Sequence, residues 1–211
     1  MSKNDQPRVH IFWDDSNIFL EGRRYAEKNE GAAYAPGFRI HGRNLFSLAA
    51  AERELGTGIC VGSIPPDLRD FWARLAKSGV AVELFERGKQ SGKEQGVDQC
   101  LQVHMLRAAL DVDKPEVAVL LTGDGAGYED GVGFHADLER LQKRGWGIEV
   151  LSWTHSCKKV LREWADYVGV FIPLESYYGS ISFIEDGLRL AQPLDLKKRT
   201  KALPIPVKRV K

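Results

Sequence analysis

The stretch VHIFWDDSN, residues 9–17, decides the fold that this sequence predicts. Val9–Trp13 is a strongly apolar run, which is typical of a buried strand, and Asp14 follows it directly. A second apolar run, Val117–Leu121, lies shortly before Asp124. Ligands of open parallel sheets bind beyond the carboxyl ends of the strands, so we expect the two carboxylates to converge there.

Strand-like and helix-like segments alternate along most of the chain. Beyond Val9–Asp14, strands are expected at Gly58–Gly62, Val80–Glu86, Val117–Thr122, Ile148–Trp153 and Val168–Ile172. Helices are expected at Gly42–Leu55, Asp67–Lys77, Val97–Leu110, Phe134–Arg144 and Ser156–Tyr167. This β-α-β order predicts an α/β fold with a mostly parallel central sheet, covered by helices on both faces.

The composition is that of a soluble globular protein. The chain has 211 residues, of which 43% are hydrophobic and 28% charged. No apolar run reaches the roughly 18–20 residues that cross a bilayer, and the first residues lack a signal-peptide pattern. Cys60, Cys100 and Cys157 are isolated within apolar patterns, which favours reduced core thiols over a disulfide or zinc framework. We therefore expect a cytoplasmic protein that does not enter a membrane.

The charge is unevenly distributed. The net charge is +1, but residues 197–211 carry seven basic residues and no acid, which leaves about −6 on residues 1–196. We expect one domain over residues 8–173, an irregular extension over 174–196 and a disordered basic tail over 197–211. Such a tail can contact polyanions or be a solvated terminus.

A third carboxylate, Asp98, opens the helical pattern GVDQCLQVHMLRAAL. Converging carboxylates repel one another, and a hard divalent cation with oxygen ligands is the usual means of offsetting this repulsion. Asp14, Asp98 and Asp124 thus predict a Mg²⁺ or Mn²⁺ site that is suited to phosphate chemistry.

Each of these motifs also has a structural interpretation. Ser16 and Asn17 can cap the helix after the first strand, and Asn17 can also order a water or a phosphate oxygen. Asp98 can be a helix cap. Lys93, in the polar loop before Asp98, can contact phosphate or be solvated. Thr122 precedes a glycine-rich stretch that matches neither a P-loop nor an EF-hand nor a calcium β-roll repeat.

Taken together, FWDDSN, KEQGVDQCLQVHML, LLTGDG and VLREWADYVGVFIPL resemble the NYN domain family, a branch of the PIN-like nuclease superfamily, over residues 8–173. The resemblance implies a three-layer α/β/α sandwich and metal-dependent hydrolysis of RNA phosphodiester bonds. Asp14 and Asn17 match the strand-end motif of the family. Asp98 matches the acid that opens its middle helix, and Asp124 the acid of its S/T-G-D motif.

The sequence departs from the family pattern at two positions. His104 stands where many members have a further acid on the middle helix, and Ala126 stands where many have a second aspartate after the S/T-G-D acid. Fewer carboxylates imply weaker cation binding. Glu129 and Asp130 lie later in the same loop and can substitute as ligands. His104 can be a ligand, a proton shuttle or a structural histidine.

Three functions remain open on these residues. The first is a ribonuclease that acts on single-stranded or structured RNA. The second is a module that binds RNA or a protein without cleaving it, which the missing acids favour. The third is a phosphatase or phosphotransferase with Asp14 as nucleophile. Against it, Ser16 stands where the haloacid-dehalogenase family has a second aspartate. A homodimer is possible through aromatic side chains, although such side chains more commonly pack in a core: Trp164, Phe171, Tyr177 and Tyr178.

Overall fold

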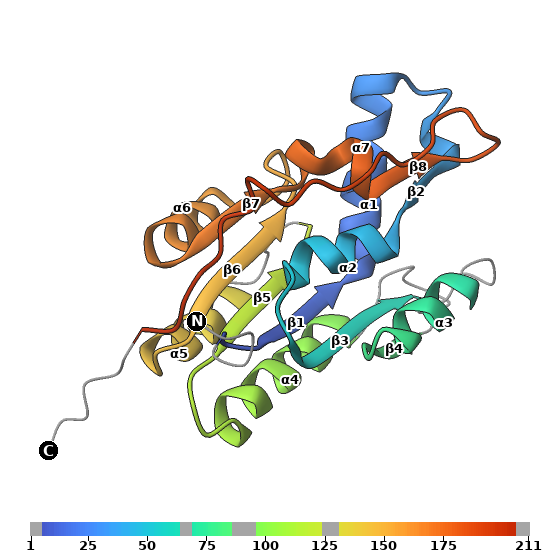
Figure 1. Cartoon of the computed structure of the whole chain (residues 1–211). Coiled ribbons are helices and arrows are strands. Elements are labelled where there is room, and N and C mark those ends of the chain that lie inside the picture. Colours follow the sequence, from blue (N-terminus) through green and yellow to red (C-terminus); the bar gives the residue numbers. More distant parts are fainter. Residues whose placement is uncertain (1–5, 64–68, 86–95, 124–130, 206–211) are drawn as a thin grey trace, which may run out of the picture.

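The computed structural model describes residues 6–63, 69–85, 96–123 and 131–205. Its centre is a parallel six-stranded sheet in the order β4-β3-β1-β5-β6-β7 (Figure 1). The strands are β1 Val9–Asp14, β3 Leu55–Ser63, β4 Ala81–Phe85, β5 Val117–Leu121, β6 Gly147–Ser152 and β7 Val170–Pro173. The helices are α1 Asp15–Glu30, α2 Gly42–Ala50, α3 Arg69–Lys77, α4 Val97–Asp111, α5 Phe134–Lys143, α6 Lys159–Val168 and α7 Tyr178–Ile181.

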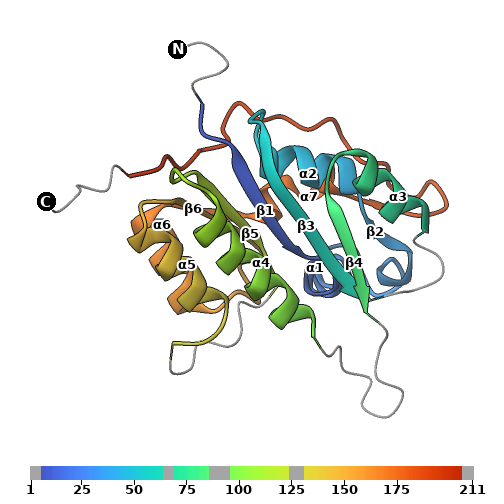
Figure 2. The ribbon, with the colours of Figure 1, turned by 90° about the horizontal axis from the view of Figure 1, so that it is seen from below.

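Helices cover both faces of the sheet, which confirms the predicted three-layer α/β/α sandwich (Figure 2). Every residue of the central strand β1 is buried. Ile11 and Trp13 pack into the core beneath α2, α3 and α7, whereas Phe12 packs into the core beneath α4, α5 and α6. Burial on both faces explains why β1 is a continuous apolar run rather than an alternating one.

The order of the strands determines where a ligand can bind. From β1 the chain builds β3 and β4 on one side, and then crosses to build β5, β6 and β7 on the other side. The direction of winding therefore changes between β1 and β5. In open α/β sheets this is the position of the ligand-binding crevice, beyond the carboxyl ends of the strands. We call this region the carboxyl edge.

The extension over residues 174–196 is more regular than predicted. It contains the 3₁₀ helix η4, Leu174–Tyr177, then α7, and then β8, Ser182–Ile184. β8 pairs in antiparallel fashion with β2, Phe38–Ile40, which follows the 3₁₀ helix η2, Ala35–Gly37. Two three-residue strands that lie far apart in the chain carry almost no local signal, and for this reason the pair was not predicted.

The boundaries of two elements differ from the prediction. Helix α2 ends at Ala50, because Ala51 and Glu52 adopt left-handed conformations with φ of 48° and 63°. Strand β3 then begins at Leu55 and is longer than the predicted Gly58–Gly62. Among the described residues, no helix has both the length and the apolar character that a membrane span requires.

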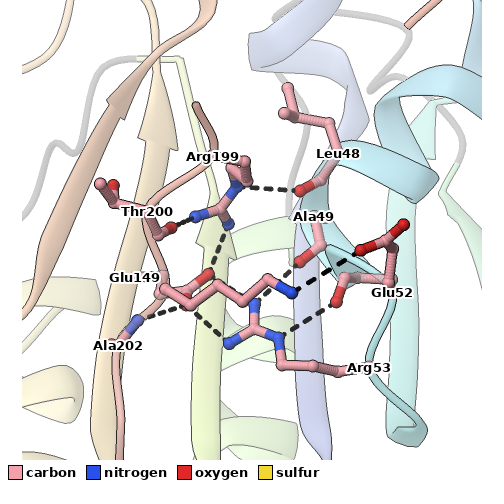
Figure 3. A network of polar contacts seen from close by, with 10 residues as sticks. Leu48, Ala49, Glu52, Arg53, Glu149, Arg199, Thr200 and Ala202 are labelled. Carbon is pink, nitrogen blue, oxygen red and sulfur yellow. Dashed lines mark hydrogen bonds and ion pairs between the residues drawn. The ribbon is translucent and has the colours of Figure 1, made fainter. Parts of the chain in front are cut away.

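The prediction of a disordered basic tail is wrong for residues 197–205. The Arg199 side chain is fully buried and forms an ion pair with Glu149 on β6, 2.5 Å from Nη2 to Oε2 (Figure 3). The backbone N–H of Ala202 donates to the same carboxylate at 2.8 Å, and the Ile205 N–H donates to the Gly145 carbonyl. A buried carboxylate requires partners, and the tail provides two of them. Residues 206–211 lie outside the described residues.

Candidate functional site

Asp14 ends β1 at the carboxyl edge, and 1% of its surface is exposed. It is the N-cap of α1, where its Oδ1 accepts the backbone N–H of Asn17 at 3.0 Å. The side-chain amide of Asn17 donates to Oδ2 at 2.6 Å. Asn17 thus holds both oxygens of the Asp14 carboxylate in one orientation. Carboxylate oxygens are ligands that a hard divalent cation accepts.

The start of α1 packs closely against the end of β5. A Cβ atom placed on Gly123 would lie 2.5 Å from the backbone oxygen of Asn17, so only glycine fits between the two segments. The Gly123 carbonyl accepts hydrogen bonds from the hydroxyls of Ser152 and Ser156. Thr122, which is fully buried, donates its backbone N–H to Leu151. The segment that leads to the S/T-G-D acid is therefore held directly beside the Asp14–Asn17 turn.

One further acid and a thiol lie near this turn. Asp15, the first residue of α1, is 5% exposed, and Ser16 beside it is also buried. Burial, together with the charges of Asp15 and Asp14, raises the pKa of the Cys60 thiol on β3 well above its ordinary value. Two carboxylates and a thiol that stays protonated thus share the inner part of the carboxyl edge.

Asp98 lies in the first turn of α4 and is exposed. Val97, the residue before it, is buried in the same core cluster as Phe12 of β1. Since α4 follows β4 and packs on a parallel sheet, its first turn begins at the carboxyl edge. Four predicted site residues, Asp124, Glu129, Asp130 and Lys93, lie outside the described residues, and so does Ala126.

His104 of α4 lies beside polar side chains of the edge strand β4 and of its own helix. Its Nε2 is 2.9 Å from Oε1 of Glu83 on β4, and the Cys100 thiol donates to Oε2 of Glu83 at 3.0 Å. Burial and the bond to Glu83 raise the pKa of Cys100 to about 12. The bonds from Cys100 and His104 lower the pKa of Glu83. Among the described residues, this trio alone has three candidate metal-ligand atoms within 4.8 Å of one another.

A groove of about 740 Å³ lies beside Asp15, between α1, α2, α3 and the β2–β8 pair. Most of its lining is cationic, imidazole or phenyl side chains: Arg39, His41, Arg43, Arg74, Lys77, Phe19, Phe71 and Phe183. The acid Glu185 also lines it and forms an ion pair with Arg39. We call it the basic groove. Its residues come from four separate segments, so no single stretch of sequence indicates it. The one local signal is the Arg-x-His-x-Arg spacing at residues 39–43.

Comparisons with known proteins agree with this architecture. The chain matches a solved structure, a protein of unknown function from Vibrio parahaemolyticus, with a TM-score of 0.57 and 18% identity over 82% of this chain and 96% of that one. At this identity the likeness shows the fold alone. No curated protein matches the chain. The family model of the NYN domain, which has a PIN-like nuclease fold, matches residues 8–175. The chain, with its strand-end acid at the carboxyl edge, therefore belongs to the NYN domain family.

Proposed function

We propose that this chain is a metal-dependent ribonuclease that hydrolyses RNA phosphodiester bonds at the carboxyl edge. One observation carries the proposal: the buried, oriented carboxylate of Asp14 lies where the sheet changes its direction of winding, with Gly123 packed against the same turn. Asp124 follows Gly123 directly in sequence. The two family acids Asp14 and Asp124 are therefore both next to the contact between Gly123 and Asn17.

The residues present fit a hard divalent cation. Asp14 offers carboxylate oxygens that Asn17 already orients, which reduces the cost of ordering a ligand. We assign Asp14, Asp98 and Asp124 as the residues that would hold Mg²⁺ or Mn²⁺, with Glu129 and Asp130 as further ligands. When bound, such a cation activates water and stabilises the charge that develops on the phosphate. Asn17 holds the Asp14 carboxylate in one orientation through two hydrogen bonds.

Substrate binding is assigned to two sets of residues. Ser16, Asn17, Thr122 and Lys93 would position the scissile phosphate next to the acids. The basic groove would hold the adjoining single strand, because Arg43, Arg74 and Lys77 suit phosphates and its phenyl rings suit stacked bases. Asp15 lines the groove at the junction with Asp14, so both sets of residues meet at the start of α1.

A second function, RNA binding without cleavage, is favoured by one observation. His104, which replaces a family acid, is paired with Glu83 on the edge strand. The middle helix therefore contributes fewer carboxylates than is usual in the family. The two functions make opposite predictions for turnover, and one set of variants separates them.

The test compares cleavage of labelled single-stranded and structured RNA in Mg²⁺, Mn²⁺ or EDTA. Asp14→Asn keeps the helix cap, because asparagine caps as well as aspartate does, but it removes the charge. We expect Asp14→Asn and Asp98→Asn to lower the cleavage rate by about 100- to 1,000-fold, since a catalytic cation contributes several kcal/mol.

Asp111→Asn is the matched control, because Asp111 is an exposed acid at the opposite end of α4. It should cleave at the wild-type rate. RNA binding without any turnover, unchanged by EDTA, would refute the nuclease and support the binding module. Metal-dependent cleavage that survives in both Asp14→Asn and Asp98→Asn would place the catalytic acids elsewhere.

A further inference from the structure

Glu83, Cys100 and His104 bring three kinds of metal-ligating atom together at one edge of the sheet. Cys100 and His104 are one helical turn apart on α4, so both side chains lie on the same face of the helix. Glu83 faces them from β4, with Oε1 2.9 Å from His104 Nε2 and Oε2 3.0 Å from Cys100 Sγ. All three ligand atoms lie within 4.8 Å of one another.

These separations are close to those of a bound zinc ion. Zinc bonds of about 2.0–2.3 Å in a tetrahedron place neighbouring ligand atoms roughly 3.3–3.8 Å apart. The two separations from Glu83 are slightly shorter, and each goes to a different carboxylate oxygen, as expected for two hydrogen bonds that a cation would replace. Side-chain adjustments would therefore bring the three ligand atoms, which already lie within 4.8 Å of one another, to tetrahedral separations.

The ligand types select the metal. A thiolate, an imidazole and a carboxylate together suit Zn²⁺, whereas Mg²⁺ and Mn²⁺ prefer oxygen ligands alone. On binding, the Cys100 thiol would release its proton to solvent and ligate as the thiolate. This ligand set differs from the aspartates at the carboxyl edge, so the two sites would be occupied by different ions.

The cluster is accessible and separate from Asp14. A surface pocket of about 360 Å³ opens onto it, and the Glu83 and His104 side chains are 43% and 22% exposed. Asp14 pairs with Val61 of β3, and Val61 pairs with Glu83, so two strand spacings of about 4.8 Å separate the residues. The same helix nevertheless carries Asp98, two residues before Cys100.

We propose that Glu83, Cys100 and His104 form a Zn²⁺ site that holds the first turns of α4 against the edge strand β4, with a water or an external ligand in the fourth position. Three protein ligands and one open position leave a bound zinc ion accessible to a water or an external ligand, unlike closed sites with four protein ligands. The proposal does not depend on the nuclease activity, because none of its ligands belongs to the aspartate set.

Cobalt substitution tests the site directly. The untagged full chain, reduced and stripped of metal, is titrated with Co²⁺ and then with Zn²⁺. We expect the near-ultraviolet charge-transfer band of a cobalt–thiolate bond, together with tetrahedral visible bands, and displacement of both by Zn²⁺. Cys100→Ser should abolish the charge-transfer band. Glu83→Gln and His104→Gln should weaken Zn²⁺ binding by on the order of 100-fold or more, since even outer-shell partners contribute 10–100-fold.

Cys157→Ser is the matched control, because Cys157 is a buried cysteine outside the cluster. It should keep the full charge-transfer band, and so should Asp14→Asn, whatever its effect on RNA. A second measurement is independent of spectroscopy: Zn²⁺ should protect Cys100, identified by mass spectrometry, from alkylation. Absence of the band, or a band that persists in Cys100→Ser with circular dichroism unchanged, would overturn the proposal.

Discussion

Glu149 is a single carboxylate in the middle of β6, and it is fully buried. The Arg53 guanidinium binds both of its oxygens, at 2.7 and 2.9 Å, and Arg199 and the Ala202 N–H complete its partners (Figure 3). Burial alone would raise the pKa of Glu149. The hydrogen bond from Arg53 and the charges of Arg199 and Arg53 outweigh this effect, and the pKa is lowered.

At the scale of this residue, we expect Glu149→Gln to lower the free energy of unfolding by about 3–5 kcal/mol at neutral pH, because it leaves buried arginines without their counter-charge. A lowered carboxyl pKa stabilises the fold fully above the ordinary value of 4.5. This stabilisation is lost as the pH falls through the folded-state pKa. In urea unfolding from pH 7 to pH 3, the free energy of unfolding should therefore fall less with decreasing pH for Glu149→Gln than for wild type. The same pH dependence in both proteins would contradict a stabilising role for the ionised Glu149 carboxylate.

At the scale of elements, the junction between α1 and β5 depends on Gly123. Gly123→Ala would place a methyl group 2.5 Å from the Asn17 backbone oxygen, and neither backbone segment can yield without moving the Asp14 turn. We expect destabilisation of about 1–3 kcal/mol, as for other overpacked sites, and a clear loss of metal-dependent cleavage.

Gly187→Ala is the comparison for that variant. Its φ is +73° and no atom lies within 4 Å of the added methyl group, so it should cost about 1 kcal/mol of backbone strain and keep cleavage intact. Thermal unfolding and the RNA cleavage rate are measured for both variants. Full activity in Gly123→Ala would show that the junction does not position the acids.

The basic groove also belongs to this scale, because α2 and α3 provide its exposed cations. The triple variant Arg43→Ala, Arg74→Ala, Lys77→Ala should reduce the slope of log affinity for single-stranded RNA against log salt by roughly 2, at about 0.7 per lost phosphate contact. The control removes three exposed cations elsewhere: Lys143, Arg144 and Lys158. Fluorescence anisotropy over a salt series gives both slopes. Equal slopes in the two triple variants would exclude the groove as the RNA path.

At the scale of the whole molecule, the tail belongs to the folded domain. Besides the Arg199–Glu149 ion pair, the backbone of Leu203 passes so close to Gly147 that a Cβ there would lie 2.9 Å from it. Truncation after Leu196 should therefore lower the free energy of unfolding by about 3 kcal/mol or more, since it removes a buried ion-pair partner. Calorimetry measures the loss.

The double variant Lys197→Ala, Lys198→Ala tests whether tail charge or tail packing matters. Both side chains are exposed, so the variant should unfold within about 0.5 kcal/mol of wild type. A truncated chain as stable as wild type would show that the tail contributes only charge.

The sequence by itself determined the parallel sheet, the helices on both faces, and Asp14 at the end of a central strand. These features follow from local patterns: a β-branched apolar run buried on both faces, helical spacing between such runs, and an acid placed directly after the first. The same local patterns indicated the NYN resemblance, because its motifs are short and lie on successive elements.

Only the tertiary structure decided the β2–β8 pair, the packing of Gly123 on Asn17, the basic groove and the course of residues 197–205. Each depends on segments that are distant in the chain. The residues around Arg199 in the sequence do not indicate that it pairs with the buried carboxylate of Glu149. The basic tail was predicted to be mobile because its charges were counted without Glu149. Burial of Glu149 at the centre of β6 makes Arg199 part of the core, because a desolvated carboxylate is stable only with its counter-charge.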